Sequence, residues 1–172
     1  MNRNIEVKAR VKDLTSLQAR VEEIADSGPA LIEQVDTFFK CYHGRLKLRE
    51  SPGADGELIF YVRPDSLEPV ESCYSRIVVS DSAGILDALS QAMGVKAIVR
   101  KRRALYHVGQ TRIHLDEVEG LGNFVELEVV LRSDESPGDG TRIARSLMER
   151  LGVSNEDLVE VAYADLLRGD TG

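Results

Sequence analysis

Apolar and polar residues alternate along most of this chain, and a few segments with helical spacing interrupt the alternation. An alternation of period two is typical of strands that bury one face. It predicts eight strands, over Ile5–Val11, Gln34–Tyr42, Arg45–Glu50, Leu58–Arg63, Ser72–Val79, Ala97–His107, Thr111–Val118 and Phe124–Leu131. Helical spacing predicts four helices, over Leu14–Ala25, Ser82–Met93, Arg142–Leu151 and Ser154–Leu167. Short strands with hairpin-length connections predict an α+β fold, in which helices pack outside an antiparallel sheet or barrel.

Length and composition favour a single globular domain over residues 1–172. Of the 172 residues, 42% are hydrophobic and 30% are charged, a balance that excludes a disordered tail and a membrane protein. The N-terminus has no apolar run, so we expect no secretory signal and a cytoplasmic location. Cys41 and Cys73 lack metal-ligand spacing and are expected to be reduced thiols.

The placement of charge is more informative than its total. The net charge of −7, from 29 acidic and 22 basic residues, disfavours nucleic acid and anionic membranes as partners. In the first predicted strand Ile5 and Val7 share one face, while Glu6 and Lys8 share the other. Other strands repeat this arrangement, and their charged faces carry arginine, lysine and carboxylates in place of the serine, threonine and glutamine of an ordinary solvated face.

Two arrangements of the sheet place these charged faces differently. In an open antiparallel sheet they meet solvent, which is the commonest arrangement and fits each strand taken alone. In a closed eight-stranded antiparallel β-barrel they enclose room for one small ligand, and helices cover the apolar faces. Arginine favours the bidentate contacts that phosphate groups offer. The abundance of arginine across all the strands therefore favours a closed barrel around a polyphosphate.

The charged faces contain the side chains that such a ligand would need. The basic residues expected to bind phosphate are Arg45, Lys47, Arg49, Arg63, Arg76, Lys101, Arg103 and Arg112. Carboxylates repel a polyphosphate unless a divalent cation lies between them, and Mg²⁺ is usually held by carboxylates together with substrate phosphates. Glu126 and Glu128 share one face, about 6–7 Å apart. The carboxylates expected to hold metal are Glu6, Asp116, Glu126 and Glu128.

At these residues the sequence resembles the CYTH family, the triphosphate tunnel metalloenzymes. The similar segments are Gln34–Phe39, Gly44–Arg49, Val99–Arg103, Leu115-Asp116 with Leu121-Gly122, Phe124–Glu128 and Tyr163–Leu167. The family's N-terminal motif, Glu-x-Glu-x-Lys, reads Asn4-Ile5-Glu6-Val7-Lys8 here, so Asn4 replaces the first carboxylate. We expect this replacement to bear on metal affinity and not on the fold, because Asn4 keeps the alternation of the strand.

The resemblance implies an enzyme that uses Mg²⁺ or Mn²⁺ to act on a small-molecule triphosphate, as a monomer or homodimer. Within the family the chain is most similar to class IV adenylate cyclases, which convert ATP to cyclic AMP and pyrophosphate. Thiamine triphosphatase, inorganic tripolyphosphatase and a non-catalytic triphosphate-binding protein stay open as alternatives, because the same cavity residues serve all of them.

Glu6 and Lys8 are the residues expected to be catalytic. Lys8 lies one strand step from Glu6, and would either contact phosphate or, with a depressed pKa among other cations, assist proton transfer. His114 lies on a charged face between Arg112 and Asp116. A cavity role and a structural hydrogen bond to a carboxylate are equally open for it, although imidazole is a poor ligand for Mg²⁺.

Overall fold

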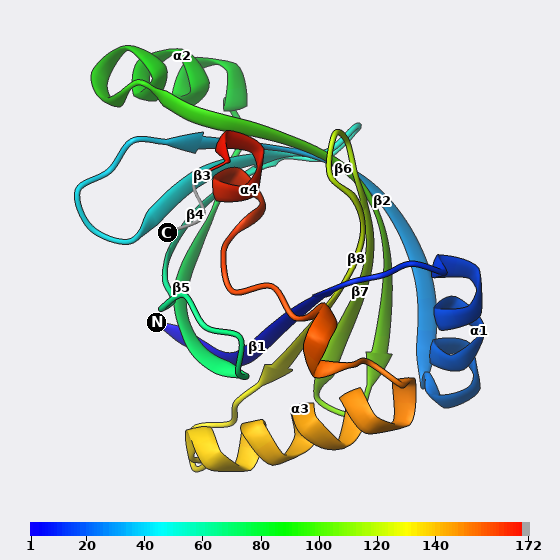
Figure 1. Cartoon of the computed structure of the whole chain (residues 1–172). Coiled ribbons are helices and arrows are strands. Elements are labelled where there is room, and N and C mark those ends of the chain that lie inside the picture. The colour runs from blue at the N-terminus through cyan, green and yellow to red at the C-terminus, as the bar shows by residue number, and fades with distance from the viewer. Residues whose placement is uncertain (170–172) are drawn as a thin grey trace.

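Eight antiparallel strands close into a barrel in the computed structural model, which describes residues 1–169 (Figure 1). The strands are β1 (Asn2–Arg10), β2 (Ser27–Phe39), β3 (Arg45–Glu50), β4 (Gly56–Val62), β5 (Val70–Val79), β6 (Val95–Val108), β7 (Thr111–Val118) and β8 (Gly122–Val130). Their order around the barrel is β1-β5-β4-β3-β2-β6-β7-β8, and β8 pairs back to β1. The predicted α+β fold with a closed barrel is confirmed.

Strands β2 and β6 are longer than predicted. Each begins before its predicted start, at Ser27 in place of Gln34 and at Val95 in place of Ala97. They pair with each other along this whole length, with a register shift between Ser27 and Ala30. Pairing between β2 and β6 therefore continues each strand through positions where the alternation of apolar and polar residues is weak.

The helices are α1 (Leu14–Ile24), α2 (Ser82–Met93), α3 (Pro137–Leu151) and α4 (Tyr163–Arg168), with a 3₁₀ turn η1 (Asn155–Asp157). Helix α3 begins five residues before its predicted start at Arg142. Ser136 and Asp139 form a reciprocal capping box there, and Pro137 occupies the first turn, where a missing N–H does no harm. Among the described residues no helix is long and apolar enough to cross a bilayer.

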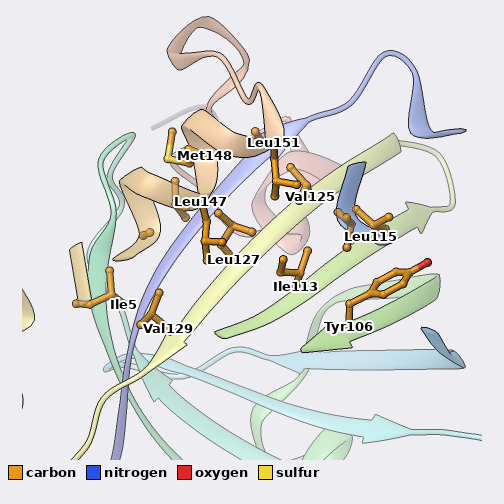
Figure 2. Packing of buried hydrophobic residues seen from close by; sticks show 14 of the residues in the cluster. Ile5, Tyr106, Ile113, Leu115, Val125, Leu127, Val129, Leu147, Met148 and Leu151 are labelled. Carbon is orange, nitrogen blue, oxygen red and sulfur yellow. The ribbon is translucent and has the colours of Figure 1, made fainter. Parts of the chain in front are cut away.

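The largest apolar core lies outside the barrel, between its outer face and helices α1 and α3 (Figure 2). Ile113 and Leu127, on the neighbouring strands β7 and β8, are fully buried there in one cluster with Leu151 of α3. Gly140 lets α3 approach β1, because a Cβ at that position would lie 2.5 Å from the Ile5 side chain. On β1, β7 and β8 the apolar faces thus point outward, and the charged faces are left to the interior.

The C-terminal segment differs from the single helix predicted over Ser154–Leu167. Between η1 and α4 the chain is extended and runs beside β1, where the Val159 N–H donates to the Lys8 carbonyl at 2.9 Å. Val159 and Val161 are buried in a second apolar cluster with Phe38. Figure 1 shows this orange-to-red segment crossing one end of the barrel. An extended backbone presents these alternate valines to the barrel, which one continuous helix would not do.

The outer core predicts a clear contrast between two leucine-to-alanine variants. Leu127→Ala removes a side chain that is 1% exposed, whereas Leu31→Ala changes a strand residue that is 81% exposed. Urea unfolding should show a loss of about 3 kcal/mol for Leu127→Ala and less than about 0.5 kcal/mol for Leu31→Ala. Equal losses would contradict a core that lies outside the barrel.

Candidate functional site

All eight strands contribute side chains to one cavity inside the barrel. Its volume is about 350 Å³, within the usual range for small-molecule sites. The predicted site residues that line it are Glu6, Lys8, Lys47, Arg49, Arg63, Arg76, Lys101, Arg103, Arg112, Glu126 and Glu128. Residues that are distant in the sequence are therefore gathered around one enclosed volume.

Two predicted site residues, Arg45 and Asp116, do not line this cavity. Arg45 donates to the Arg63 carbonyl at 3.1 Å and to the carboxylate of Asp65 at 2.7 Å. Asp116 is completely buried and accepts two hydrogen bonds from Arg103, at 2.7 and 2.6 Å, and one from the Tyr163 hydroxyl at 2.9 Å. The geometry makes Asp116 a residue that positions Arg103, and its role as a metal ligand stays a prediction.

Asp36 of β2 gathers three cations on one side of the cavity. Its carboxylate accepts hydrogen bonds from Arg49 Nε at 2.7 Å, Lys47 Nζ at 2.9 Å and Lys101 Nζ at 3.1 Å. Burial acts to raise the pKa of Asp36, but the three cations hold it well below its usual value. Burial and the nearby Arg103 lower the pKa of Lys101 to about 7. This wall of the cavity therefore has more positive charge than one carboxylate neutralises.

Asp36 had no predicted role. Its alternation with Gln34 and Phe38 places it on one face of a strand, and all three side chains do line the cavity. Nothing in the local pattern indicates that β3 and β6 both pair with β2, so the meeting with three cations was not predictable from the sequence.

Three glutamates lie across the barrel from Asp36, on strands β1 and β8. Glu6 faces Glu128 in the strand register, and Lys8 faces Glu126. Burial and the charge of Glu126 raise the pKa of Glu6 to about 7, although Arg63 lies 3.0 Å from it. Burial acts the same way on Glu126 and Glu128, but neighbouring basic groups hold both pKa values below the usual range. Glu6 is thus the carboxyl of this group that ionises last.

The donor atoms on this side fit a divalent cation. Glu126, Glu128 and His114 each offer one donor atom, and these atoms lie within 4.8 Å of one another. Burial and Arg103 lower the pKa of His114, so its ring is neutral at pH 7. The Asn4 side chain also lines the cavity, and its buried Oδ1 has no hydrogen-bond partner among the described residues. Carboxylate oxygens are the ligands that Mg²⁺ and Mn²⁺ prefer, and an ion here would share Glu126 with Arg103 and Glu128 with Arg112, which donate to them at 3.0 Å each.

The C-terminal segment closes one end of the cavity. Lys8 Nζ donates to the Val161 carbonyl at 3.3 Å and lies 4.2 Å from the ring centre of Tyr163. The Tyr163 side chain itself lines the cavity. Arg76 also lines it, and its side chain is 55% exposed, so the cavity opens to solvent on that side.

Arg63 keeps hydrogen-bonding capacity for a ligand. Its Nη1 donates to the Glu160 carbonyl at 3.0 Å. Its Nη2 is buried and has no hydrogen-bond partner within residues 1–169, whereas its Nε forms an ion pair with Glu6 Oε1 at 3.0 Å. Buried donors without partners are costly, and a phosphate oxygen is a natural acceptor for a guanidinium group.

The chain is an eight-stranded antiparallel barrel that encloses a charged cavity and has its main apolar core outside. The model of the CYTH domain family matches residues 2–163, and the chain belongs to this family. The predicted family resemblance is therefore confirmed over nearly the whole chain.

Individual relatives agree with this assignment. The chain is 32% identical over 68 residues to adenylate cyclase CyaB of Aeromonas hydrophila, and the match spans 40% of this chain and 36% of that protein. The PH1012 protein of Pyrococcus horikoshii OT3 superposes with a TM-score of 0.86 at 25% identity, covering 95% and 98% of the two chains. HpAC1 of Hippeastrum, described as having a dominant triphosphatase activity, has a TM-score of 0.69 at 16% identity, covering 98% and 96%. At that identity the likeness shows the fold alone.

The raised pKa of Glu6 predicts that its charge destabilises the metal-free protein. A carboxyl whose pKa rises on folding favours the folded state at low pH, and this contribution is lost as the pH rises toward 7. In EDTA at pH 8, Glu6→Gln should therefore raise Tm by about 5 °C, or about 2 kcal/mol. The difference from the wild type should shrink as the pH falls toward 5, which thermal denaturation across this range would measure.

Glu126→Gln is the matched control for this experiment. Glu126 has a lowered pKa and an ion pair with Arg103 at 3.0 Å, so its neutralisation should lower Tm at pH 8. A lower Tm for Glu6→Gln at pH 8 would contradict the assigned origin of the Glu6 shift.

Loss of the Asp36 charge should lower Tm, and added anions should restore part of that loss. Asp36→Asn leaves three buried cations without their carboxylate, at a cost of about 3–5 kcal/mol. Sodium sulfate should raise the Tm of this variant more than that of the wild type, because sulfate replaces the missing negative charge. Asp134→Asn, at an exposed position, is the control, and an equal response to sulfate in all three proteins would refute the explanation.

Proposed function

We propose that this chain is a divalent-metal-dependent enzyme that converts ATP to cyclic AMP and pyrophosphate inside the barrel. The observation that carries the proposal is the opposition of two walls across one cavity, one basic around Asp36 and one acidic around Glu126. The basic wall attracts a polyanion, and the three glutamates, each already paired with a basic group, are the oxygen donors available to a cation that accompanies it. The family assignment and the CyaB relative support the same reaction class.

The basic wall is suited to bind the triphosphate. Lys47, Arg49 and Lys101 point into the cavity from β3 and β6, where each can donate to phosphate oxygens. Lys101 has a pKa of about 7 in the ligand-free protein, and a bound anion raises that pKa because it stabilises the ammonium form. Triphosphate binding should therefore be accompanied by proton uptake near neutral pH.

The acidic wall divides into two chemical roles. Glu126 and Glu128 stay ionised and are suited to hold Mg²⁺ or Mn²⁺, which when bound supplies charge neutralisation on the phosphate chain. Glu6, with a pKa of about 7, is suited to accept a proton at neutral pH. The Lys8 side chain lies beside this wall, with its Nζ 3.7 Å from Glu126.

In the proposed cyclisation the two walls act on different parts of ATP. The ribose 3′ oxygen attacks the α-phosphorus, the bond from that phosphorus to the β-bridging oxygen breaks, and pyrophosphate leaves. The hydroxyl proton passes to Glu6, and the basic wall holds the leaving pyrophosphate. Most of the catalysis is positioning and electrostatic stabilisation, as in phosphoryl transfer generally.

Triphosphate hydrolysis is the second candidate, because water can take the place of the ribose oxygen on the same two walls. The described triphosphatase activity of HpAC1, a protein of the same fold, favours its inclusion. A triphosphate-binding protein without turnover is the third reading of the same cavity.

Product analysis separates these three candidates. ATP, tripolyphosphate and thiamine triphosphate are incubated with the protein in Mg²⁺ or Mn²⁺, and the products are identified by ³¹P NMR and ion-exchange chromatography. We expect cyclic AMP with pyrophosphate from ATP. Orthophosphate release would favour the hydrolase, and a raised Tm without turnover would favour the binding protein. No product and no Tm rise with any triphosphate would refute all three.

A pair of arginine variants tests the basic wall. Arg49→Ala removes a cavity guanidinium and should lower kcat/KM by about 100-fold or more. Arg102→Ala removes an exterior side chain that is 71% exposed and should leave kcat/KM unchanged. Equal effects of the two substitutions on steady-state kinetics would show that the reaction does not take place inside the barrel.

A further inference from the structure

We propose that His114 is a ligand of the cavity cation through Nδ1, and that it makes the site prefer Mn²⁺ to Mg²⁺. The inference rests on the proposed metal-dependent function and deepens it. It adds a nitrogen ligand to a site that the sequence predicted to be made of carboxylates alone.

The position of His114 on β7 places its ring beside the acidic wall. In the strand register His114 faces Glu126 on β8. Its Nδ1 lies 3.9 Å from a carboxylate oxygen of Glu126 and 3.7 Å from one of Glu128. Within residues 1–169 these three residues form the group of donors close enough to share one ion.

The second observation is that the His114 Nδ1 atom has no hydrogen-bond partner in the described chain. The His114 side chain is 5% exposed, and Nδ1 is buried. Buried polar atoms are normally paired, and each exception calls for a physical explanation. A neutral imidazole with its proton on Nε2 presents a lone pair at Nδ1, and a cation held by the two glutamates would use it.

The chemistry of the donors decides the preferred ion. Mg²⁺ favours an all-oxygen octahedral environment and keeps several waters. Imidazole is a better ligand for first-row transition ions than for Mg²⁺, and Mn²⁺ is a first-row ion that also binds carboxylates. Two glutamates and one histidine therefore favour Mn²⁺ over Mg²⁺.

Pulsed EPR on the untagged full chain with Mn²⁺ alone tests the proposal directly. A nitrogen bonded to Mn²⁺ produces a ¹⁴N modulation of the electron spin echo. We expect this modulation in the wild type and its loss in His114→Gln. The matched control is His107→Gln, at an exposed histidine, which should keep the signal.

Calorimetry supplies a second readout that is independent of activity. The ratio of Mn²⁺ to Mg²⁺ affinity should fall at least 10-fold in His114→Gln and stay unchanged in His107→Gln. His114→Asp, which restores an oxygen donor, should bind Mg²⁺ at least as tightly as the wild type does.

The outcomes separate this inference from the proposed function. Bound Mn²⁺ without a ¹⁴N modulation would overturn the histidine ligand and leave the triphosphate reaction standing. A ¹⁴N modulation that depends on His114, in a protein without turnover, would support the ligand and count against the enzyme. If Mn²⁺ does not bind even when tripolyphosphate is added, both proposals fail.

Discussion

Burial of charge inside a closed barrel is the constraint on which the rest of this structure depends. A charge removed from water is stable only when it is paired and hydrogen-bonded. Asp36 meets this condition with three cations, and Asp116 meets it with Arg103 and Tyr163. Glu6 meets it poorly, as its raised pKa shows. The interior is thus held together by its ion pairs, and the wall around Asp36 keeps residual positive charge.

This constraint also decides where the apolar core lies. Because the inward faces are charged, the outward faces must be covered, and α1 and α3 bury them against β1, β7 and β8. The close approach at Gly140 belongs to this layer. The stability of the barrel therefore depends on this outer core as well as on the ion pairs inside. The outer core lets the cavity keep uncompensated charge without losing the fold.

The C-terminal segment joins the two layers. Its valines are buried at the end of the barrel, while its backbone carbonyls accept hydrogen bonds from Lys8 and Arg63 inside. Tyr163 both lines the cavity and binds Asp116. The arrangement of the site and the docking of this segment are consequently coupled, and the cavity has one closed end and one open end.

The sequence by itself determined the strands, the inward and outward faces and most of the charged lining, because alternation is a local property of an extended chain. The closed barrel followed from the resemblance and from the arginine content. Tertiary structure alone decided the partners: Asp36 with its three cations, Asp116 with Arg103 and Tyr163, and His114 beside Glu126. It also decided that residues between η1 and α4 are extended and not helical. Pairing between distant strands sets these contacts, and side-chain chemistry at one position carries no record of which strand will lie beside it.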